Sequence, residues 1–283
     1  MARPSTWLHD CRHNIHSQAG EDGVIAAILS LLPTHDNWCV EFGAWDGLFL
    51  SNAANLVCNK GYSAVFIEGD PAKFKELEKN YSGNVQVTRL CRLVGYGDND
   101  NLDTVLAQTK VPRDFDFLSI DIDGNDYHVW RAVTKFSPKL VCIEFNPTIP
   151  TEVDFVQERR ADTKQGNSLS ALAKLGKEKG YELACVLPFN AFFVKRELFP
   201  LLEIDDNRPQ TLRIDTEAVT YLFSGFDGSI HLSGSHRLPW HDVGISQSRL
   251  QVLPRFLRRY PDDYSVLQRR ALKIVLRFFR SLS

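Results

Sequence analysis

Acidic and amide side chains gather immediately after the apolar, strand-like segments of this sequence. These residues are Glu41, Asp46, Glu68, Asp70, Asp121, Asp123, Asn125, Asp126, Glu144 and Asn146, with Gly43 and Gly47 among them. Carboxylates in such groups can accept a proton, bind a hard divalent cation or receive a positively charged ligand. The same loops carry no lysine or arginine, so they lack the counter-charge that a pyrophosphate or triphosphate needs. The pattern therefore favours a cationic, nucleoside-like ligand.

The segments that must position these side chains alternate between strand and helix patterns. Strands are predicted over residues 38–42, 63–70, 84–90, 115–123, 139–147, 181–187 and 191–198, and helices over 21–33, 51–61, 71–81, 101–109, 126–136 and 167–180. Such alternation predicts a parallel sheet with helices on both faces. Only residues 188–190 separate the last two strands, too few for a crossover helix, so these strands should form an antiparallel hairpin. We therefore predict an α/β, Rossmann-like fold with a seven-stranded, mostly parallel sheet and a reversed last strand.

The motifs at the strand ends resemble those of the class I S-adenosylmethionine-dependent methyltransferases. VEFGAWDG at residues 40–47 is similar to their first motif, E/D-x-G-x-x-x-G, and FIEGD at 66–70 to the acidic end of their second strand. LSIDIDGNDYHVW at 118–130 resembles a D-x-E-G-x-E-type segment of the FkbM-like branch, with Asp123 and Asp126 in place of the two glutamates. The resemblance covers roughly residues 15–200. A nicotinamide enzyme and a kinase are excluded because the chain has neither G-x-G-x-x-G nor G-x-x-x-x-G-K-[ST].

The resemblance implies S-adenosyl-L-methionine as the cofactor and gives roles to the residues of the first two loops. Gly43 would let the backbone approach the ligand, Glu41 would lie near the methionine ammonium, and Glu68 would accept both ribose hydroxyls. Residues 51–52 would donate to the methionine carboxylate, and residues 17–23 lie where the FkbM-like branch has a lid. The predicted cofactor-binding residues are Gln18, Glu41, Gly43, Ala44, Asp46, Gly47, Ser51, Asn52, Glu68 and Asp121.

Methyl transfer to an alcohol also requires that the acceptor lose its proton, which calls for a base or a metal ion. Asp121, Asp123 and His128 follow the fourth strand and are the predicted catalytic residues. Asp123 is the preferred base. His128 is either a second candidate base or simply a surface residue of a helix. Asp123, Glu144 and Asn146 offer hard oxygen ligands, so we predict Mg²⁺ or Mn²⁺ as a candidate ion there. The alternative is that Glu144 and Asn146 bind the acceptor or neighbouring backbone.

Together these inferences predict an O-methyltransferase that acts on a carbohydrate or polyol hydroxyl, such as that of a glycan, a capsule or a natural-product sugar. The long loop after the fifth strand carries Arg159, Arg160 and Lys164, which suit an anionic substrate or are simply solvated. Two alternatives stay open. One is an N-methyltransferase of a small molecule, because nothing fixes the acceptor atom. The other is a non-catalytic partner protein with the same fold.

The C-terminal part of the chain differs from the rest in charge. The 283 residues have a net charge of −2, which gives no nucleic-acid footprint, yet residues 249–283 hold nine Lys/Arg and two Asp/Glu. Residues 263–283 form a basic amphipathic pattern, with Leu267, Ala271, Ile274, Val275, Phe278 and Leu282 on one face. This pattern suits peripheral membrane contact, and equally packing on its own domain or a homodimer partner.

The domain and compartment predictions follow from these features. Residues 1–200 should form the cofactor-binding domain, 201–248 a short β/turn extension and 249–283 a helical tail. The N-terminus has no apolar signal core, and no stretch approaches 18 apolar residues. The six dispersed cysteines indicate reduced core thiols. We therefore expect a cytoplasmic protein, with the tail as a candidate for contact with the inner membrane face.

Overall fold

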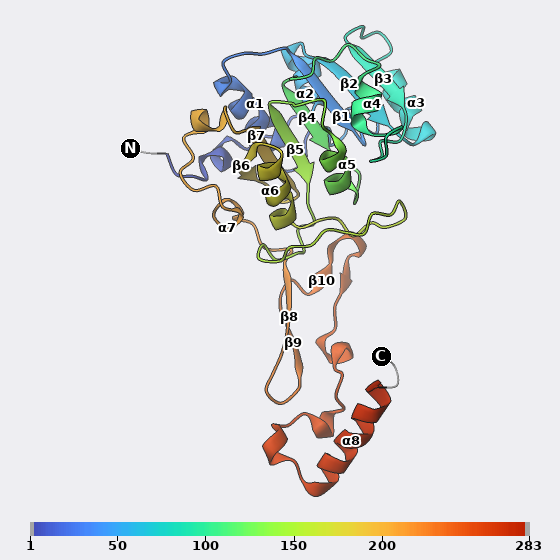
Figure 1. The fold of residues 1–283 in the computed structure, drawn as a ribbon, viewed down its shortest axis with the longest axis vertical. Helices are drawn as coiled ribbons and strands as arrows, with labels where there is room; N and C mark the ends of the chain where they lie inside the picture. The colour runs from blue at the N-terminus through green and yellow to red at the C-terminus, as the bar shows by residue number, and fades with distance from the viewer. Residues whose placement is uncertain (1–2, 281–283) are drawn as a thin grey trace. The chain divides into compact units, whose positions relative to one another are not determined.

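The computed structural model describes residues 3–280, which divide between Thr216 and Glu217 into two compact units. The first unit contains the large sheet and its covering helices, and the second contains short hairpins and a C-terminal helix (Figure 1). Residues 201–216 fold with the first unit: the indole nitrogen of Trp7 donates to the carbonyl of Leu202 at 2.9 Å. The compact α/β unit therefore continues beyond residue 200.

The sheet of the first unit has seven strands in the order β3-β2-β1-β4-β5-β7-β6. The strands are β1 (Trp38–Phe42), β2 (Ser63–Glu68), β3 (Val87–Cys91), β4 (Phe117–Ile120), β5 (Leu140–Glu144), β6 (Tyr181–Val186) and β7 (Asn190–Lys195). All neighbours are parallel except β7, which is antiparallel to both β5 and β6. The predicted fold class, including the reversed last strand, is confirmed. The central position of β1 places its carboxyl end between those of β2 and β4.

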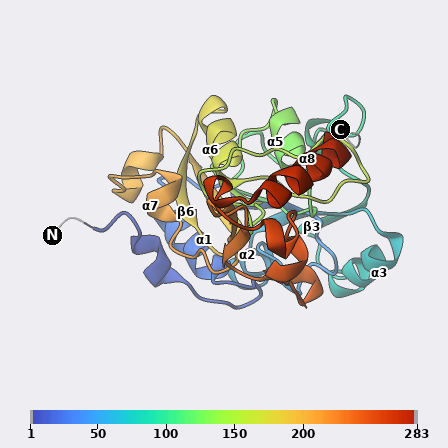
Figure 2. The ribbon, with the colours of Figure 1, turned by 90° about the horizontal axis from the view of Figure 1, so that it is seen from below.

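Helices cover both faces of this sheet. They are α1 (Glu21–Leu31), α2 (Ala54–Lys60), α3 (Pro71–Asn80), α4 (Leu102–Leu106), α5 (Asp126–Ala132), α6 (Leu169–Glu178) and α7 (Pro209–Leu212), with the 3-10 turns η1 (Trp7–Cys11) and η2 (Phe199–Leu202). Figure 2 shows α1, α2 and α3 on one side of the sheet and α5 and α6 on the other. Buried residues such as Phe66, Leu118 and Ile143 line the strand interiors, as burial on both faces requires.

Two helix boundaries differ from the sequence prediction because side chains capture the backbone. Helix α2 was predicted from residue 51 but begins at Ala54, whose N–H donates to the Ser51 hydroxyl at 3.0 Å. Helix α5 ends at Ala132, because the buried carboxylate of Asp103 accepts the N–H groups of residues 134–136 at 2.7–3.2 Å. The predicted end of α2 at Gly61 is confirmed by its left-handed φ of 71°.

The second unit contains short hairpins in the predicted β/turn extension, followed by the predicted C-terminal helix. Its elements are β8 (Thr220–Ser224), β9 (Ile230–Gly234), β10 (Arg237–Leu238), η3 (Pro239–His241), β11 (Val243–Gly244), η4 (Gln247–Leu250), η5 (Arg255–Leu257), η6 (Pro261–Asp263) and α8 (Val266–Arg280). The strands β8 and β9 pair antiparallel around the FDGS turn. Leu282 of the predicted apolar face lies outside the described residues.

The cysteines agree only in part with the predicted reduced core thiols. All six cysteines are free, but Cys58 and Cys91 are exposed rather than in the core, so only part of that prediction is correct. Within residues 3–280 no helix is both long enough and apolar enough to cross a bilayer.

Candidate functional site

The turn after β1 packs directly against the turn after β4. Gly43 has a φ of 75°, and a Cβ on it would overlap the backbone oxygen of Asp121. Gly47 has a φ of 74°, and a Cβ there would lie 2.6 Å from Leu77 Cδ1 and 2.7 Å from Tyr81 Cε2. Both positions therefore require glycine. At Gly43 the Asp121 carbonyl alone excludes a side chain. The predicted close approach of a ligand would be a second reason for glycine at this position.

Glu68 at the end of β2 joins the first two loops. The carboxylate is buried and accepts the N–H of Trp45 and the N–H of Asp70, both at 2.7 Å. Trp45 has a left-handed φ of 47°, and its bond to Glu68 fixes that unusual conformation. Since a carboxylate can accept about four hydrogen bonds, Glu68 retains capacity for two further donors.

Glu41 is buried beneath the first loop and is satisfied by protein donors. The Ser51 hydroxyl donates to one oxygen and the Asn52 N–H to the other at 2.8 Å, while Asn52 Nδ2 donates to Ser119 Oγ at 3.1 Å. Burial raises the pKa of Glu41 to about 7, although these hydrogen bonds oppose the shift. The roles predicted for Glu41, Ser51 and Asn52 toward the methionine moiety stay predictions, and they require these groups to exchange partners.

The raised pKa of Glu41 predicts a stability that depends on pH. The group binds its proton more tightly in the folded state (pKa about 7) than at its ordinary value of 4.5, so its contribution is greatest below pH 4.5 and is lost as pH rises through 7. The free energy of unfolding should therefore decrease by up to about 3 kcal/mol from this group between pH 4 and pH 8.

Urea unfolding of the wild type and of Glu41→Gln at several pH values measures this contribution. Other acids titrate in both proteins, so the difference between the two curves isolates Glu41. We expect the variant to have the shallower pH dependence; parallel curves would contradict the assignment.

The remaining residues predicted to bind the cofactor shape the loops around Glu68. Asp46 accepts the N–H groups of residues 48 and 49 at 2.9 and 2.8 Å, and Ala44 is buried with its N–H bonded to the carbonyl of Ile67 at 3.2 Å. Gln18 is exposed beside a cavity of about 360 Å³. That cavity contains none of the other residues predicted to bind the cofactor. Contact between Gln18 and the cofactor therefore stays a prediction.

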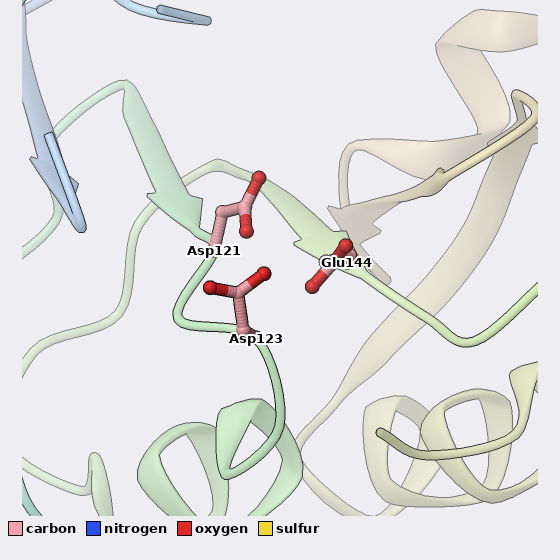
Figure 3. A group of neighbouring side chains, drawn as sticks. All are labelled: Asp121, Asp123 and Glu144. Carbon is pink, nitrogen blue, oxygen red and sulfur yellow. The ribbon is translucent and has the colours of Figure 1, made fainter. Parts of the chain in front are cut away.

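Three carboxylates meet where β4 and β5 end. Figure 3 shows Asp121 and Asp123 on the turn after β4 and Glu144 at the end of β5. One oxygen from each lies within 4.8 Å of the others. The turn is tight, since Asp123 has a left-handed φ of 56°. Lys164 Nζ lies 3.4 Å from Asp123 Oδ2 in an exposed ion pair. We call Asp121, Asp123 and Glu144 the acidic cluster.

Burial and the repulsion between neighbouring carboxylates raise pKa values in and beside the acidic cluster. Burial, followed by the neighbouring charges of Asp126 and Asp123, raises the pKa of Asp121. Burial and the charge of Asp121 raise the pKa of Glu144, and burial also raises that of Asp126. The cluster therefore disfavours full ionisation, and a proton or a cation would relieve its repulsion.

Asn146 was predicted as a metal ligand beside Asp123 and Glu144, and that role stays a prediction. Asn146 Oδ1 accepts the N–H and the hydroxyl of Thr148 at 2.9 and 2.7 Å, and its Nδ2 donates to the carbonyl of Gln165 at 2.7 Å. Among the acidic side chains, the structure brings Asp121 together with Asp123 and Glu144. Three carboxylate donors fit a hard cation such as Mg²⁺ or Mn²⁺.

His128 does not belong to the acidic cluster among the residues that the structure describes. Its Nε2 lies 2.9 Å from the carbonyl oxygen of Gln157, and its ring packs edge-on against Tyr96 and Tyr127. These contacts hold α5 against the long loop after β5. A catalytic role for His128 stays a prediction.

Comparisons with known proteins give similarities of fold only. No protein-family model matches the sequence, and no curated protein matches it. Among solved structures, the chain resembles the N-terminal domain of EvdMO1 with SAH bound, at 11% identity over 62% of this chain and 79% of that one, with a TM-score of 0.41. Magnesium protoporphyrin IX methyltransferase from Synechocystis PCC 6803 with bound SAH is 11% identical over 62% of this chain and 81% of that one, with a TM-score of 0.40. The CurJ carbon methyltransferase is 11% identical over 62% of this chain and 52% of that one, with a TM-score of 0.41.

Because these TM-scores are below 0.5, the fold assignment rests on the strand order of this chain. A parallel sheet of order 3-2-1-4-5 that continues with a reversed seventh strand and then the sixth is a specific topology. The fold is the predicted α/β, Rossmann-like one with a reversed last strand. In open α/β sheets of this kind ligands bind beyond the carboxyl ends of the strands, which is the edge where Glu41, Glu68 and the acidic cluster lie.

The first unit also has a polar cavity that the sequence did not predict. It has a volume of about 860 Å³, and its lining includes Tyr96, Tyr127, His128, Arg131 and Arg159. The Arg159 guanidinium stacks 4.4 Å from the ring centroid of Tyr96 and donates to its carbonyl at 3.0 Å. These residues come from three distant segments without a shared spacing, so only the charge of the long loop hinted at this cavity.

Proposed function

We propose that this chain is an S-adenosylmethionine-dependent O-methyltransferase that acts on a carbohydrate or polyol hydroxyl, as its FkbM-like motifs suggest. The observation that carries the proposal is the position of Glu68, a buried carboxylate that ends β2 and anchors the glycine turn after β1. In a fold of this class, an acid at the end of the second strand is placed to accept ribose hydroxyls.

The charge of the strand ends supports a sulfonium cofactor. S-adenosylmethionine carries a positive sulfur and an ammonium group, and the loops after β1, β2 and β4 present acids without a lysine or arginine of their own. A phosphate-bearing dinucleotide would be repelled by the same loops. The electrostatics therefore favours the cofactor that the motifs imply.

The acceptor side supports an alcohol rather than an apolar substrate. The acidic cluster offers carboxylates to receive the hydroxyl proton as the new C–O bond forms and the sulfonium C–S bond breaks. The nearby helix α5 also borders the polar cavity, whose tyrosines and cations suit a hydroxylated, anionic acceptor. Transfer in line between sulfur and oxygen depends mainly on positioning, which the tight turn at Asp123 supplies.

A divalent cation is an alternative occupant of the acidic cluster. Asp121, Asp123 and Glu144 would hold Mg²⁺ or Mn²⁺, which would polarise the acceptor hydroxyl and assist loss of its proton. Lys164, 3.4 Å from Asp123 Oδ2, neutralises part of the charge of that carboxylate. We propose metal assistance as secondary to a direct proton-accepting role.

Calorimetric titration with S-adenosylhomocysteine tests the cofactor assignment. We expect the wild type to bind and Glu68→Gln to bind about 10–100-fold more weakly, because two hydrogen bonds to a charged acceptor lose strength. Glu76→Gln on the exposed face of α3 is the matched control and should bind as the wild type does. Absence of binding by the wild type would reject the proposal and favour the non-catalytic partner protein.

A methyl-transfer screen tests the acceptor. Sugar nucleotides and glycan fragments should accept methyl groups, and their amino-sugar analogues identify the atom. Methylation confined to the amines would favour the N-methyltransferase alternative.

A further inference from the structure

The C-terminal helix α8 separates its charges from its apolar residues. Over residues 266–277 it contains no acidic residue, and its cations are Arg269, Arg270, Lys273 and Arg277. At 100° per residue these four fall within an arc of roughly 100°, which also contains Val266 of the first turn. The remaining surface carries Leu267, Ala271, Leu272, Ile274, Val275 and Leu276. This is the distribution of a helix that lies at an apolar–aqueous boundary.

The apolar arc of α8 is only partly covered within the second unit. Leu267 and Ile274 are 75% and 69% exposed, and Arg270 lies beside both of them, at helix spacings of three and four residues. The short turn η5 contacts α8, and Gln268 Nε2 donates to the carbonyl of Phe256 at 2.8 Å. Phe256 is itself 56% exposed and is flanked by arginines at positions 255, 258 and 259. Exposed apolar side chains therefore lie next to cations in both η5 and α8.

The cations of α8 have no carboxylate partners among the described residues. No salt bridge within residues 3–280 involves Arg269, Arg270, Lys273 or Arg277. Residues 217–283 as a whole hold ten Lys/Arg and five Asp/Glu, a formal charge of +5. The positive field of this unit therefore calls for an anionic partner.

We propose that the second unit binds an anionic phospholipid surface, with α8 lying in the interfacial plane. Lipid headgroups would receive the cations, and the acyl boundary would receive Leu267 and Ile274. A second copy of this chain would cover the apolar side chains but leave the cations without an opposite charge. A nucleic acid would satisfy the cations but leave the apolar side chains in water. At 15 residues, about 22 Å, α8 is too short to span the hydrocarbon core, so it lies on the surface.

Vesicle flotation of the full chain tests this proposal independently of methyl transfer. We expect co-flotation with phosphatidylcholine vesicles that contain phosphatidylglycerol and not with phosphatidylcholine alone. The triple variant Arg270→Gln, Lys273→Gln, Arg277→Gln should partition on the order of 100-fold more weakly. Lys75→Gln, Lys79→Gln, Lys110→Gln removes the same charge from exposed positions of the first unit and should float as the wild type does.

A second variant separates lipid from the other occupants. Leu267→Asn with Ile274→Asn keeps every cation, so it should lose flotation but keep any binding to duplex DNA. Flotation that this variant retains, or equal losses in the two triple variants, would overturn the proposal. So would a wild type that fails to float, or a concentration-dependent dimer in sedimentation that the Asn variant abolishes while vesicle binding persists. Circular dichroism confirms that each variant keeps its helix content.

Discussion

Replacing Asp123 by Asn is expected to lower methyl transfer by about 10²–10⁴-fold while changing the affinity for S-adenosylhomocysteine only slightly. The substitution is almost isosteric, and Asn tolerates the left-handed φ of 56° at this position, so the turn after β4 should persist. What it removes is a carboxylate that can accept the hydroxyl proton or bind a cation. Turnover numbers and calorimetric affinities of the same preparations provide the comparison.

Asp114→Asn is the matched control, because Asp114 is an exposed aspartate on the other side of β4 and should leave turnover unchanged. Equal losses in turnover and cofactor affinity would contradict an acceptor-side role for Asp123. Treating the wild type with a chelator then distinguishes the two uses of the cluster. Full activity after chelation supports proton acceptance by the carboxylates alone, whereas activity restored only by Mg²⁺ or Mn²⁺ supports the cation.

The sequence predicted the strands, their mostly parallel arrangement and the reversed last strand, because these depend on local patterns. Apolar runs and the short link at residues 188–190 were sufficient for the fold and its reversed strand. Helix boundaries were less predictable where a distant side chain intervened. Asp103 ends α5 through bonds to residues 134–136, about thirty residues away, and no periodicity in α5 contains that information.

The sequence identified which residues lie at the strand ends, but not which partners their side chains choose. Strand ends identified Asp121, Asp123 and Glu144, since parallel strands deliver their carboxyl ends to one edge. The sequence did not show that Thr148, two residues after Asn146, donates to its Oδ1 through both the N–H and the hydroxyl. Whether a polar side chain turns toward a site or toward its own backbone depends on local geometry that residue type does not specify.

The hydrogen-bond partners of the residues after the first loop were also not predicted. Ser51 and Asn52 are well placed by sequence to donate to a ligand, yet in the structure they donate to Glu41. A buried acid must be hydrogen-bonded, and the nearest donors satisfy it. The sequence indicated that Glu41 matters, whereas the identity of its partners depended on how the loop closes over β1.

Gly43→Ala is expected to destabilise the protein by more than about 3 kcal/mol. A left-handed φ costs an alanine roughly 1–2 kcal/mol, and its Cβ would also overlap the backbone oxygen of Asp121, which belongs to a fixed turn. Urea unfolding of the variant at constant pH measures the loss.

Gly61→Ala separates the two contributions within the same protein. Gly61 has a nearly identical φ of 71°, but nothing lies within 4 Å of a Cβ built on it, so it should lose only the conformational part, about 1–2 kcal/mol. The excess loss at Gly43 then measures how tightly the turns after β1 and β4 are pressed together. Since the second of these turns carries Asp121 and Asp123, folded Gly43→Ala should also turn over more slowly than Gly61→Ala at saturating cofactor. Equal stability losses in the two variants would mean that the β4 turn yields easily, and it could not then hold the acidic cluster in a fixed geometry.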